Sequence, residues 1–366
     1  MKKKIIHICQ ASIGGTVEYL RLFIDNIDTN KYENILICPS DGNMKKKLEN
    51  KVDRLYIVEM CREINLYRDL KNILDIRKIL KTENADIIYL HSSKAGALGR
   101  IANLNLKGRI FYNPHGWSFT INCSKNKKKF YALLEKILYP FCEKIINISK
   151  DEYIQALKFG LSDKKMCIIE NGIDILKYRN NDKINFKDRY VVGFVGRLSE
   201  QKNPLLLIGI AEEIIEEIPN ILFYIVGDGN LRRQLEEQIS TKQLENYFYF
   251  RGWSEAVEED IRNFDIALMI SKWEGFGLVV CEYMAAKKIV IGIPVGGVKD
   301  IIIDGVTGFL VNDYNVKEIC KKIKEIKNQQ MNQIKESAYL YVKNQYSIKK
   351  VIENHNNIFK KDSRGD

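Results

Sequence analysis

The sequence lacks a long apolar run. No stretch approaches ~18 consecutive apolar residues, the length that a helix needs to cross a bilayer, so we predict no membrane span. The first residues resemble a signal peptide only briefly, because their apolar run is short and turns polar at Gln10. Residues 5–9 are therefore predicted to form a first strand.

The sequence also lacks the usual metal-binding and nucleic-acid-binding signatures. Its eight cysteines include no Cys-x-x-Cys pair and no zinc-type spacing, and Cys9, Cys38 and Cys167 lie in apolar, strand-like runs. They are predicted to be reduced core residues of a cytoplasmic protein, with no metal site. No Gly-x-Gly-x-x-Gly, helix-turn-helix, base-stacking or zinc-finger pattern occurs, so dinucleotide and nucleic-acid binding have no motif in their favour.

The length and the charge distribution indicate two unlike halves. A chain of 366 residues suits two domains, which we place at residues 1–180 and 181–345, with a tail at 346–366. Residues 1–180 hold 32 Lys+Arg against 20 Asp+Glu, a charge of +12, whereas residues 181–366 hold 26 against 27, a charge of −1. An anionic partner should therefore bind the first half. The charge alone is compatible with either an anionic membrane surface or a nucleic acid as that partner.

Short apolar runs alternate with helical patterns along both halves, which predicts an α/β fold with parallel, doubly wound sheets. In such sheets ligands bind beyond the carboxyl ends of the strands, so the loops there are the candidate sites. The tail from residue 316 to about 359 is predicted to be helical. The predicted strands are residues 5–9, 35–38, 55–58, 87–90, 110–112, 145–148, 190–195, 221–226, 248–250, 264–270 and 290–293, with 305–310 completing the second sheet.

Three strand-end loops in the first half contain candidate ligand groups. Gly14 and Gly15 follow the first strand and allow a phosphate or a sugar to approach the backbone closely. The loop 91–96 contains serines before a helix, which are either N-caps or ligand contacts. His115 lies between Pro114 and Gly116, a position more typical of a pocket rim than of a core, and an imidazole there can donate a hydrogen bond or accept a proton.

The segment 271–284 is the main candidate site. An apolar strand, a turn of Glu274, Gly275, Phe276 and Gly277, and a helix beginning near Leu278 together form an anion site, because the first-turn N–H groups and the helix dipole favour negative charge. Two carboxylates, Glu274 and Glu282, flank this turn. They suit a ligand that carries hydroxyl groups beside its phosphates.

A second cationic loop follows the first strand of the second half. Arg197 and Lys202 lie five residues apart in it, and both can converge on a diphosphate, the guanidinium as a fork and the ammonium as a point charge. The glycine turn 227–229 follows the next strand.

A lysine run at 127–129 precedes an apolar helical pattern over residues 130–141. One interpretation is a core-facing helix with a solvated charged end. The other is a membrane-docking helix, because lysines at a helix N-terminus oppose the helix dipole and an external anion would explain them.

Together these motifs resemble those of family 4 glycosyltransferases, in the same order along nearly the whole chain. The resemblance is carried by Gly14-Gly15, His115, Gly196-Arg197 with Lys202, Gly227-Asp228-Gly229, Glu274 with Glu282, and Gly296-Gly297. The stretches 91–96 and 114–117 resemble bacterial capsule and exopolysaccharide members. Val298-Lys299-Asp300 departs from the Val-Pro-Glu type that is usual in the family, so the resemblance does not extend to the donor contact of that loop.

The resemblance implies a GT-B fold, with two Rossmann-like domains facing across a cleft and a C-terminal helix crossing back to the first. It implies a retaining, metal-independent transferase that needs no cofactor and moves a sugar from a nucleotide-diphosphate sugar, with UDP the expected nucleotide. Arg197 and Lys202 would stabilise the leaving diphosphate, Glu274 the donor sugar, Glu282 the ribose, and His115 would touch the sugar from the first domain, with the departing phosphate oxygen taking the acceptor proton.

The expected acceptor is a lipid-linked, polyprenyl diphosphate saccharide at the inner membrane face, met by the basic first domain. Two alternatives remain open. One is a GT-B isomerase of the UDP-N-acetylglucosamine 2-epimerase type, against which the Arg197/Lys202 and Glu274/Glu282 set argues. The other is a non-enzymatic nucleotide-binding or nucleic-acid-binding protein.

Overall fold

The protein divides into two compact units, each built on its own parallel sheet. The computed structural model describes residues 2–11, 14–120, 123–179, 185–186, 188–329 and 331–360. Unit 1 comprises Met1–Asn171 with Ile348–Asp366, and unit 2 comprises Gly172–Ser347. The domain limits predicted at residues 180 and 346 stay predictions.

Unit 1 contains a seven-stranded sheet in which every neighbouring pair is parallel. All six strands predicted for the first half are present, and β7, which has only three residues, was not predicted. The order is β3-β2-β1-β4-β5-β6-β7. The strands are β1 (Lys3–Cys9), β2 (Tyr32–Cys38), β3 (Arg54–Ile57), β4 (Ile87–His91), β5 (Arg109–Asn113), β6 (Lys144–Asn147) and β7 (Met166–Ile168).

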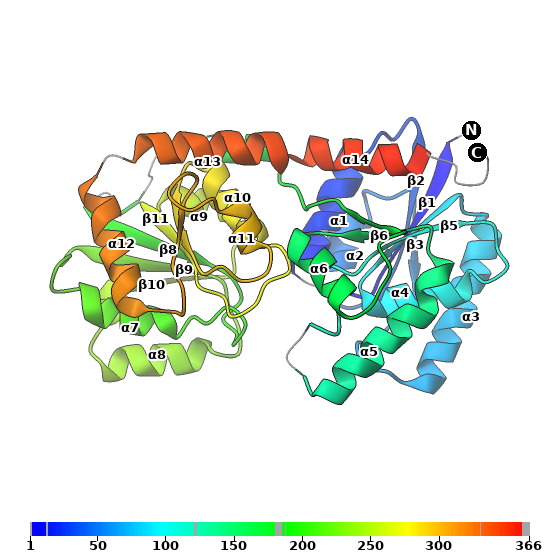
Figure 1. Ribbon diagram of the computed structural model, residues 1–366, viewed down its shortest axis with the longest axis horizontal. Helices are drawn as coiled ribbons and strands as arrows, with labels where there is room; N and C mark the ends of the chain where they lie inside the picture. The colour runs from blue at the N-terminus through cyan, green and yellow to red at the C-terminus, as the bar shows by residue number, and fades with distance from the viewer. Residues whose placement is uncertain are drawn as a thin grey trace. The chain divides into compact units, whose positions relative to one another are not determined.

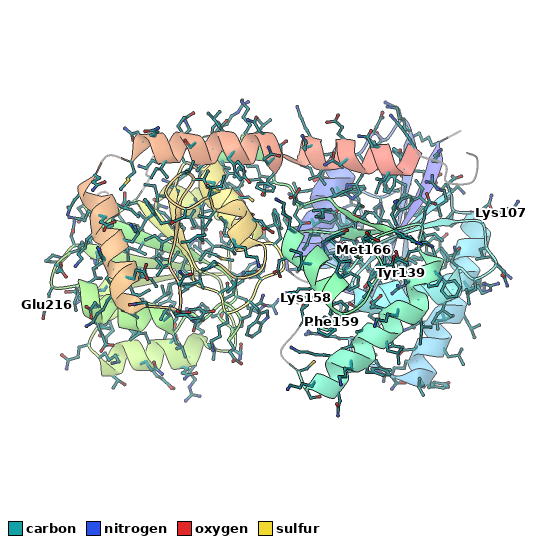
Figure 2. All side chains as sticks on the ribbon, in the orientation of Figure 1. Lys107, Tyr139, Lys158, Phe159, Met166 and Glu216 are labelled. Atoms are coloured by element: carbon teal, nitrogen blue, oxygen red, sulfur yellow. The ribbon has the colours of Figure 1, made fainter. Side chains whose placement is uncertain are left out.

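Helices cover both faces of this sheet because its strands are apolar on both sides. One buried layer contains side chains of α1 (Gly15–Asn26), α2 (Asn43–Leu48) and α14 (Ile348–Lys360). Figure 1 labels these three helices. The other contains side chains of α3 (Leu66–Glu83), α4 (Ser93–Ala102), α5 (Lys125–Leu138) and α6 (Lys150–Lys158). The edge of this second layer is filled by Tyr139, Phe159 and Met166, which Figure 2 labels.

The C-terminal helix α14 belongs to unit 1 and packs beside α1, which confirms the predicted return of the tail to the first domain (Figure 1). His355, at its centre, is fully buried. Its Nδ1 lies 2.8 Å from the carbonyl oxygen of Val351 and must donate there, so Nε2 is left to accept from the Tyr89 hydroxyl at 2.8 Å. Helix and sheet are thus joined by a hydrogen bond inside an apolar layer.

Unit 2 contains a six-stranded parallel sheet of order β10-β9-β8-β11-β12-β13. Its strands are β8 (Tyr190–Val195), β9 (Ile221–Val226), β10 (Phe248–Gly252), β11 (Ile266–Met269), β12 (Ile289–Gly292) and β13 (Phe309–Leu310). Its helices are α7 (Leu206–Ile214), α8 (Arg232–Thr241), α9 (Val257–Arg262), α10 (Leu278–Ala285), α11 (Val298–Ile301), α12 (Val316–Asn328) and α13 (Asn332–Gln345).

The strand order reverses beside the first strand of each unit. The candidate loops follow the strands at these two switch points. In unit 1, β1 lies between β2 and β4, and in unit 2, β8 lies between β9 and β11. Loops after two strands that flank such a switch point leave the sheet in opposite directions, so a crevice opens between them where ligands bind. None of the helices in the described part of the chain is long and apolar enough to cross a membrane.

Candidate functional site

In unit 2 the loop after β8 lies directly against the glycine turn after β9. A Cβ on Gly227 would stand 2.0 Å from the carbonyl oxygen of Gly196, and one on Gly229 would stand 2.4 Å from the carbonyl oxygen of Leu198. Backbone hydrogen bonds join the two segments, from Gly196 N to Val226 O at 2.9 Å and from Leu198 N to Asp228 O at 3.0 Å. The two glycines therefore permit a contact that holds the Arg197 loop in place.

The loop after β11 lies in the same way against the glycine pair after β12. A Cβ on Gly296 would stand 1.7 Å from the carbonyl oxygen of Glu274, and one on Gly297 would stand 2.7 Å from that of Phe276. Gly277 has φ +96° and is the N-cap of α10. Among the described residues no side chain caps this helix N-terminus, which leaves the first turn of α10 for an external anion.

Lys202 and Glu274 meet between these two loops. The Lys202 Nζ lies 2.5 Å from Glu274 Oε1, and the Ser271 hydroxyl donates to the same oxygen at 2.7 Å. The Glu274 side chain is 8% exposed and that of Lys202 is 19% exposed, so the pair is shielded and still open to a ligand. A second cation that arrives here would compete with Lys202 for Glu274, and a diphosphate would compete with Glu274 for Lys202.

Arg197 and Glu282 lie on either side of this pair in the sequence. Arg197 is exposed at the start of the loop after β8, and Glu282 is partly buried in the second turn of α10. The structure brings Lys202 and Glu274 into contact, which the sequence did not predict. Gly275, Phe276 and Gly277 lie in the turn and α10 begins at Leu278, as predicted.

Three hydrogen bonds that hold the loops of this site together were not predicted from the sequence. Gln201 donates through Nε2 to the carbonyl oxygen of Trp273 at 3.0 Å, and its own carbonyl oxygen accepts from Lys272 N at 2.7 Å. The Tyr283 hydroxyl accepts from Val195 N at 2.8 Å. The only sequence signal for these hydrogen bonds is the position of the polar residues beside apolar strands. The clearest case is Tyr283, which lies within an otherwise apolar helix.

In unit 1, His115 follows β5 with φ +51°, a backbone conformation that is unusual for a residue with a side chain. Its N–H donates to Asn113 Oδ1 at 3.0 Å, and the next N–H, of Gly116, donates to Glu152 Oε1 at 2.6 Å. Its ring meets that of Tyr19 edge-on, with centroids 4.7 Å apart. His115 is partly exposed, and desolvation in its surroundings lowers its pKa to about 3, so the ring is neutral at physiological pH.

Gly14 and Gly15 begin α1, the helix that supplies Tyr19. Gly14 is the N-cap with φ +89° and Gly15 is the first helical residue, and both are exposed. Residues 12 and 13 of the same predicted loop lie outside the described residues. Ser92, in the loop 91–96, accepts from Ala95 N at 3.4 Å and is an N-cap, so the N-cap interpretation of that serine is confirmed.

The apolar stripe of α5 faces outward. Phe130, Leu133 and Ile137 are 48%, 55% and 57% exposed, while the buried side chains of the helix are Ala132, Glu135 and Leu138. The core-facing interpretation of this helix is therefore wrong for most of the stripe. The physical reason lies in Arg100 of α4, which is buried and pairs with Glu135 at 2.7 Å, so the inner face of α5 carries an ion pair.

Within the described ranges, no three His, Cys, Asp or Glu side chains lie close enough together to hold a metal ion. No disulfide joins the cysteines, all eight of which the structure describes, and five of them are buried.

Comparison with known proteins points to one family. Residues 13–176 match the family model "Glycosyltransferase Family 4", and residues 177–341 match "Glycosyl transferases group 1". The chain is 29% identical over 326 residues to an Escherichia coli UDP-Gal:alpha-D-GlcNAc-diphosphoundecaprenol alpha-1,3-galactosyltransferase, covering 85% of this chain and 84% of that protein. It is 27% identical to the Staphylococcus aureus capsular polysaccharide biosynthesis glycosyltransferase CapM, covering 99% of each.

Solved structures agree on the fold. The Anabaena protein HepE, crystallised with UDP and glucose, matches with a TM-score of 0.83 at 20% identity, covering 97% of this chain and 99% of that one. A likeness at this identity concerns the fold, and the expected GT-B class is confirmed.

Proposed function

The chain belongs to the family 4 glycosyltransferases, and we propose that it transfers a sugar from a UDP-sugar to a lipid-linked saccharide during synthesis of a bacterial surface polysaccharide. The choice of acceptor is supported by the E. coli relative, whose name specifies a diphosphoundecaprenol-linked sugar, and by CapM. The choice of UDP is supported by that name and by the UDP bound to HepE.

The observation that carries the proposal is the Lys202–Glu274 pair at the switch point of unit 2. An incoming diphosphate would draw Lys202 to its oxygens, and Arg197 from the same loop would add a second positive charge. The first-turn N–H groups of α10 face the same anion. These groups stabilise negative charge as the diphosphate leaves, which is where such donors contribute most to rate.

The two glutamates take different parts of the donor. Glu274 is held by Ser271 and accepts hydrogen bonds from sugar hydroxyls once Lys202 turns to the phosphates. Glu282 lies in the second turn of α10, beyond the first-turn N–H groups that bind the diphosphate, and accepts from the ribose. His115, in unit 1, contacts a sugar hydroxyl.

Transfer proceeds with retention in this proposal, without a metal ion or a cofactor. The bond between the anomeric carbon and the diphosphate oxygen breaks, and the bond to the acceptor oxygen forms on the same face. The proton of the acceptor hydroxyl passes to the departing diphosphate oxygen, so charge and atoms balance.

The membrane partner is proposed to be an anionic surface that α5 meets. Phe130, Leu133 and Ile137 form an exposed apolar stripe, and the helix begins with lysines at positions 125 and 127–129. Apolar side chains next to cations suit a peripheral helix at the boundary between headgroups and acyl chains. The enzyme would thereby reach its lipid-linked acceptor at the inner face of the membrane.

The test is release of UDP from a set of UDP-sugars, with and without a polyprenyl diphosphate saccharide, in the presence of EDTA. Acceptor-dependent release that survives EDTA supports the proposal. Conversion of UDP-N-acetylglucosamine without release of UDP identifies the isomerase instead, and an absolute need for a divalent metal refutes the metal-independent mechanism. Binding of UDP with no turnover on any acceptor leaves a nucleotide-binding protein.

A further inference from the structure

All four histidines of the sequence lie in unit 1, and three of them form a continuous hydrogen-bonded string. His115 Nε2 lies 3.1 Å from His91 Nδ1, and His91 Nε2 lies 3.2 Å from His7 Nδ1. The string ends at Asn34, whose Oδ1 lies 3.3 Å from His7 Nε2. Neighbouring rings are nearly parallel, with interplanar angles of 26° and 21°.

The strand order produces this string. Asn34 lies on β2, His7 on β1 and His91 at the end of β4, three adjacent strands of the sheet. The side chains share the face covered by α1 and α14, and Asn34, His7 and His91 are at most 1% exposed. Burying a polar string inside an apolar layer is expensive unless each group is hydrogen-bonded, and here each ring lies within hydrogen-bond distance of the next.

Burial keeps the rings neutral. Desolvation lowers the pKa of His7 to about 4 and that of His91 well below its usual value. A neutral imidazole has one donor nitrogen and one acceptor nitrogen, so every ring in the string must point its N–H the same way. Only two arrangements are allowed, and the group at the buried end selects between them.

The position of Asn34 Oδ1 selects one arrangement. His7 donates from Nε2 to this oxygen, so His7 Nδ1 accepts from His91 Nε2. His91 Nδ1 then accepts from His115 Nε2. Consequently the proton of His115 lies on Nε2, and its Nδ1, which makes no hydrogen bond to any described residue, is a bare acceptor.

We propose that Asn34, His7 and His91 are positioning residues that hold His115 in the Nε2–H tautomer, so that its Nδ1 accepts a hydrogen bond from a substrate hydroxyl. The hydroxyl belongs to a sugar, and this part rests on the proposed function. The tautomer itself does not depend on the reaction. Tyr19 assists by packing edge-on against the His115 ring.

The experiment reads the tautomers directly. With only four histidines, selective ¹⁵N labelling gives a simple spectrum, in which protonated and bare ring nitrogens have distinct chemical shifts. Wild type should show Nε2–H for His7, His91 and His115, and Nδ1–H for His355, whose Nδ1 donates to Val351. A spectrum with Nδ1–H on His115 overturns the proposal.

Variants of Asn34, the residue at the buried end of the string, then test whether it selects the tautomer of His115. Asn34→Gln retains a neutral amide oxygen as acceptor and should retain the His115 tautomer, whereas Asn34→Leu removes the acceptor and should give a mixture of the two tautomers. With Asn34→Leu, turnover should fall about tenfold, the loss of roughly one hydrogen bond, while affinity for UDP stays unchanged. An unchanged His115 tautomer in Asn34→Leu refutes the positioning role.

A double variant separates positioning from simple destabilisation. His91→Phe cuts the string next to His115, so adding Asn34→Leu to it should lower turnover no further. Additive losses would mean that Asn34 acts on turnover by another route and would overturn the inference. If no sugar is transferred at all, the proposed function fails, while the spectra still decide the tautomer. If Asn34→Leu does not fold, the comparison of Asn34→Gln with His91→Phe gives the same decision.

Discussion

The carbonyl oxygen of Glu274 lies 1.7 Å from the point at which a Cβ atom on Gly296 would stand. No side chain fits in that space, so the loop that presents the Glu274 carboxylate to Lys202 depends on a glycine twenty-two residues further along the chain. The contact is between two backbones and cannot be relieved by a change of rotamer.

Gly296→Ala should therefore displace the Glu274 loop, and Gly305→Ala is its matched control. Both glycines have positive φ, +52° and +70°, but a Cβ on Gly305 meets open space. The left-handed backbone alone should lower the free energy of unfolding by roughly 1–2 kcal/mol in each variant, and Gly296→Ala should lose more and bind UDP weakly. Urea unfolding and calorimetric titration measure both. Equal losses in the two variants would contradict the contact.

Arg197→Ala and Lys202→Ala should each lower turnover by about 10²–10³-fold, because each removes a donor that stabilises charge on the leaving diphosphate. Arg233→Ala, on the exposed face of α8 in an ion pair with Glu237, is the control and should leave turnover unchanged. Steady-state kinetics in EDTA measure all three. Near-normal turnover in both site variants would count against the diphosphate role.

Glu274→Gln and Glu282→Gln should separate sugar binding from nucleotide binding. Glu274→Gln should slow transfer and leave affinity for bare UDP almost intact, whereas Glu282→Gln should weaken UDP because it removes the ribose acceptor. Calorimetric titration with UDP alone distinguishes them, and Glu216→Gln, on the surface of unit 2 (Figure 2), is the control. The reverse pattern would mean that the two roles are exchanged.

Lys127/Lys128/Lys129→Glu should abolish co-sedimentation with anionic liposomes at low salt. Each lysine near an anionic surface contributes about 1 kcal/mol, which is screened within a Debye length of about 8 Å at physiological salt. The same chain contains a matched triplet, Lys45/Lys46/Lys47 on α2, against the opposite face of the sheet, and its reversal to Glu should leave binding intact. Equal loss in both triplets, or equal binding to neutral liposomes, would argue against docking through α5.

Acidification from pH 7.5 to pH 5.5 should lower the free energy of unfolding of the protein. Burial lowers the pKa of His7 and of His355 to about 4, so each contributes stability that is present above pH 6.5 and lost as pH falls toward 4. Each loses on the order of 1 kcal/mol over this interval.

Glu152 acts in the opposite direction. Burial raises its pKa to about 7, so its contribution is present at low pH and lost as pH rises from about 4.5 through 7. One carboxyl offsets only part of the loss at four histidines. Urea unfolding at the two pH values measures the net effect, and a wild type more stable at pH 5.5 would contradict it. His355→Gln should reduce the loss.

The sequence by itself determined the two parallel sheets, most strand positions and the loops in which the candidate residues lie. Alternation of apolar runs and helical patterns is local, and a parallel strand buried on both faces shows as a continuous apolar run. The turn from Glu274 to Gly277 and the beginning of α10 at Leu278 could be predicted for the same reason.

Only the tertiary structure decided which loops touch and which side chains share a face. The Lys202–Glu274 pair, the contact of Gly296 with Glu274, and the string from Asn34 to His115 join residues that are distant in sequence, through a strand order that local patterns do not encode. The outward stripe of α5 has the same origin. An apolar helix face predicts burial only when no ion pair takes the side of the helix that faces the core. In α5 the ion pair of Arg100 with Glu135 takes that side.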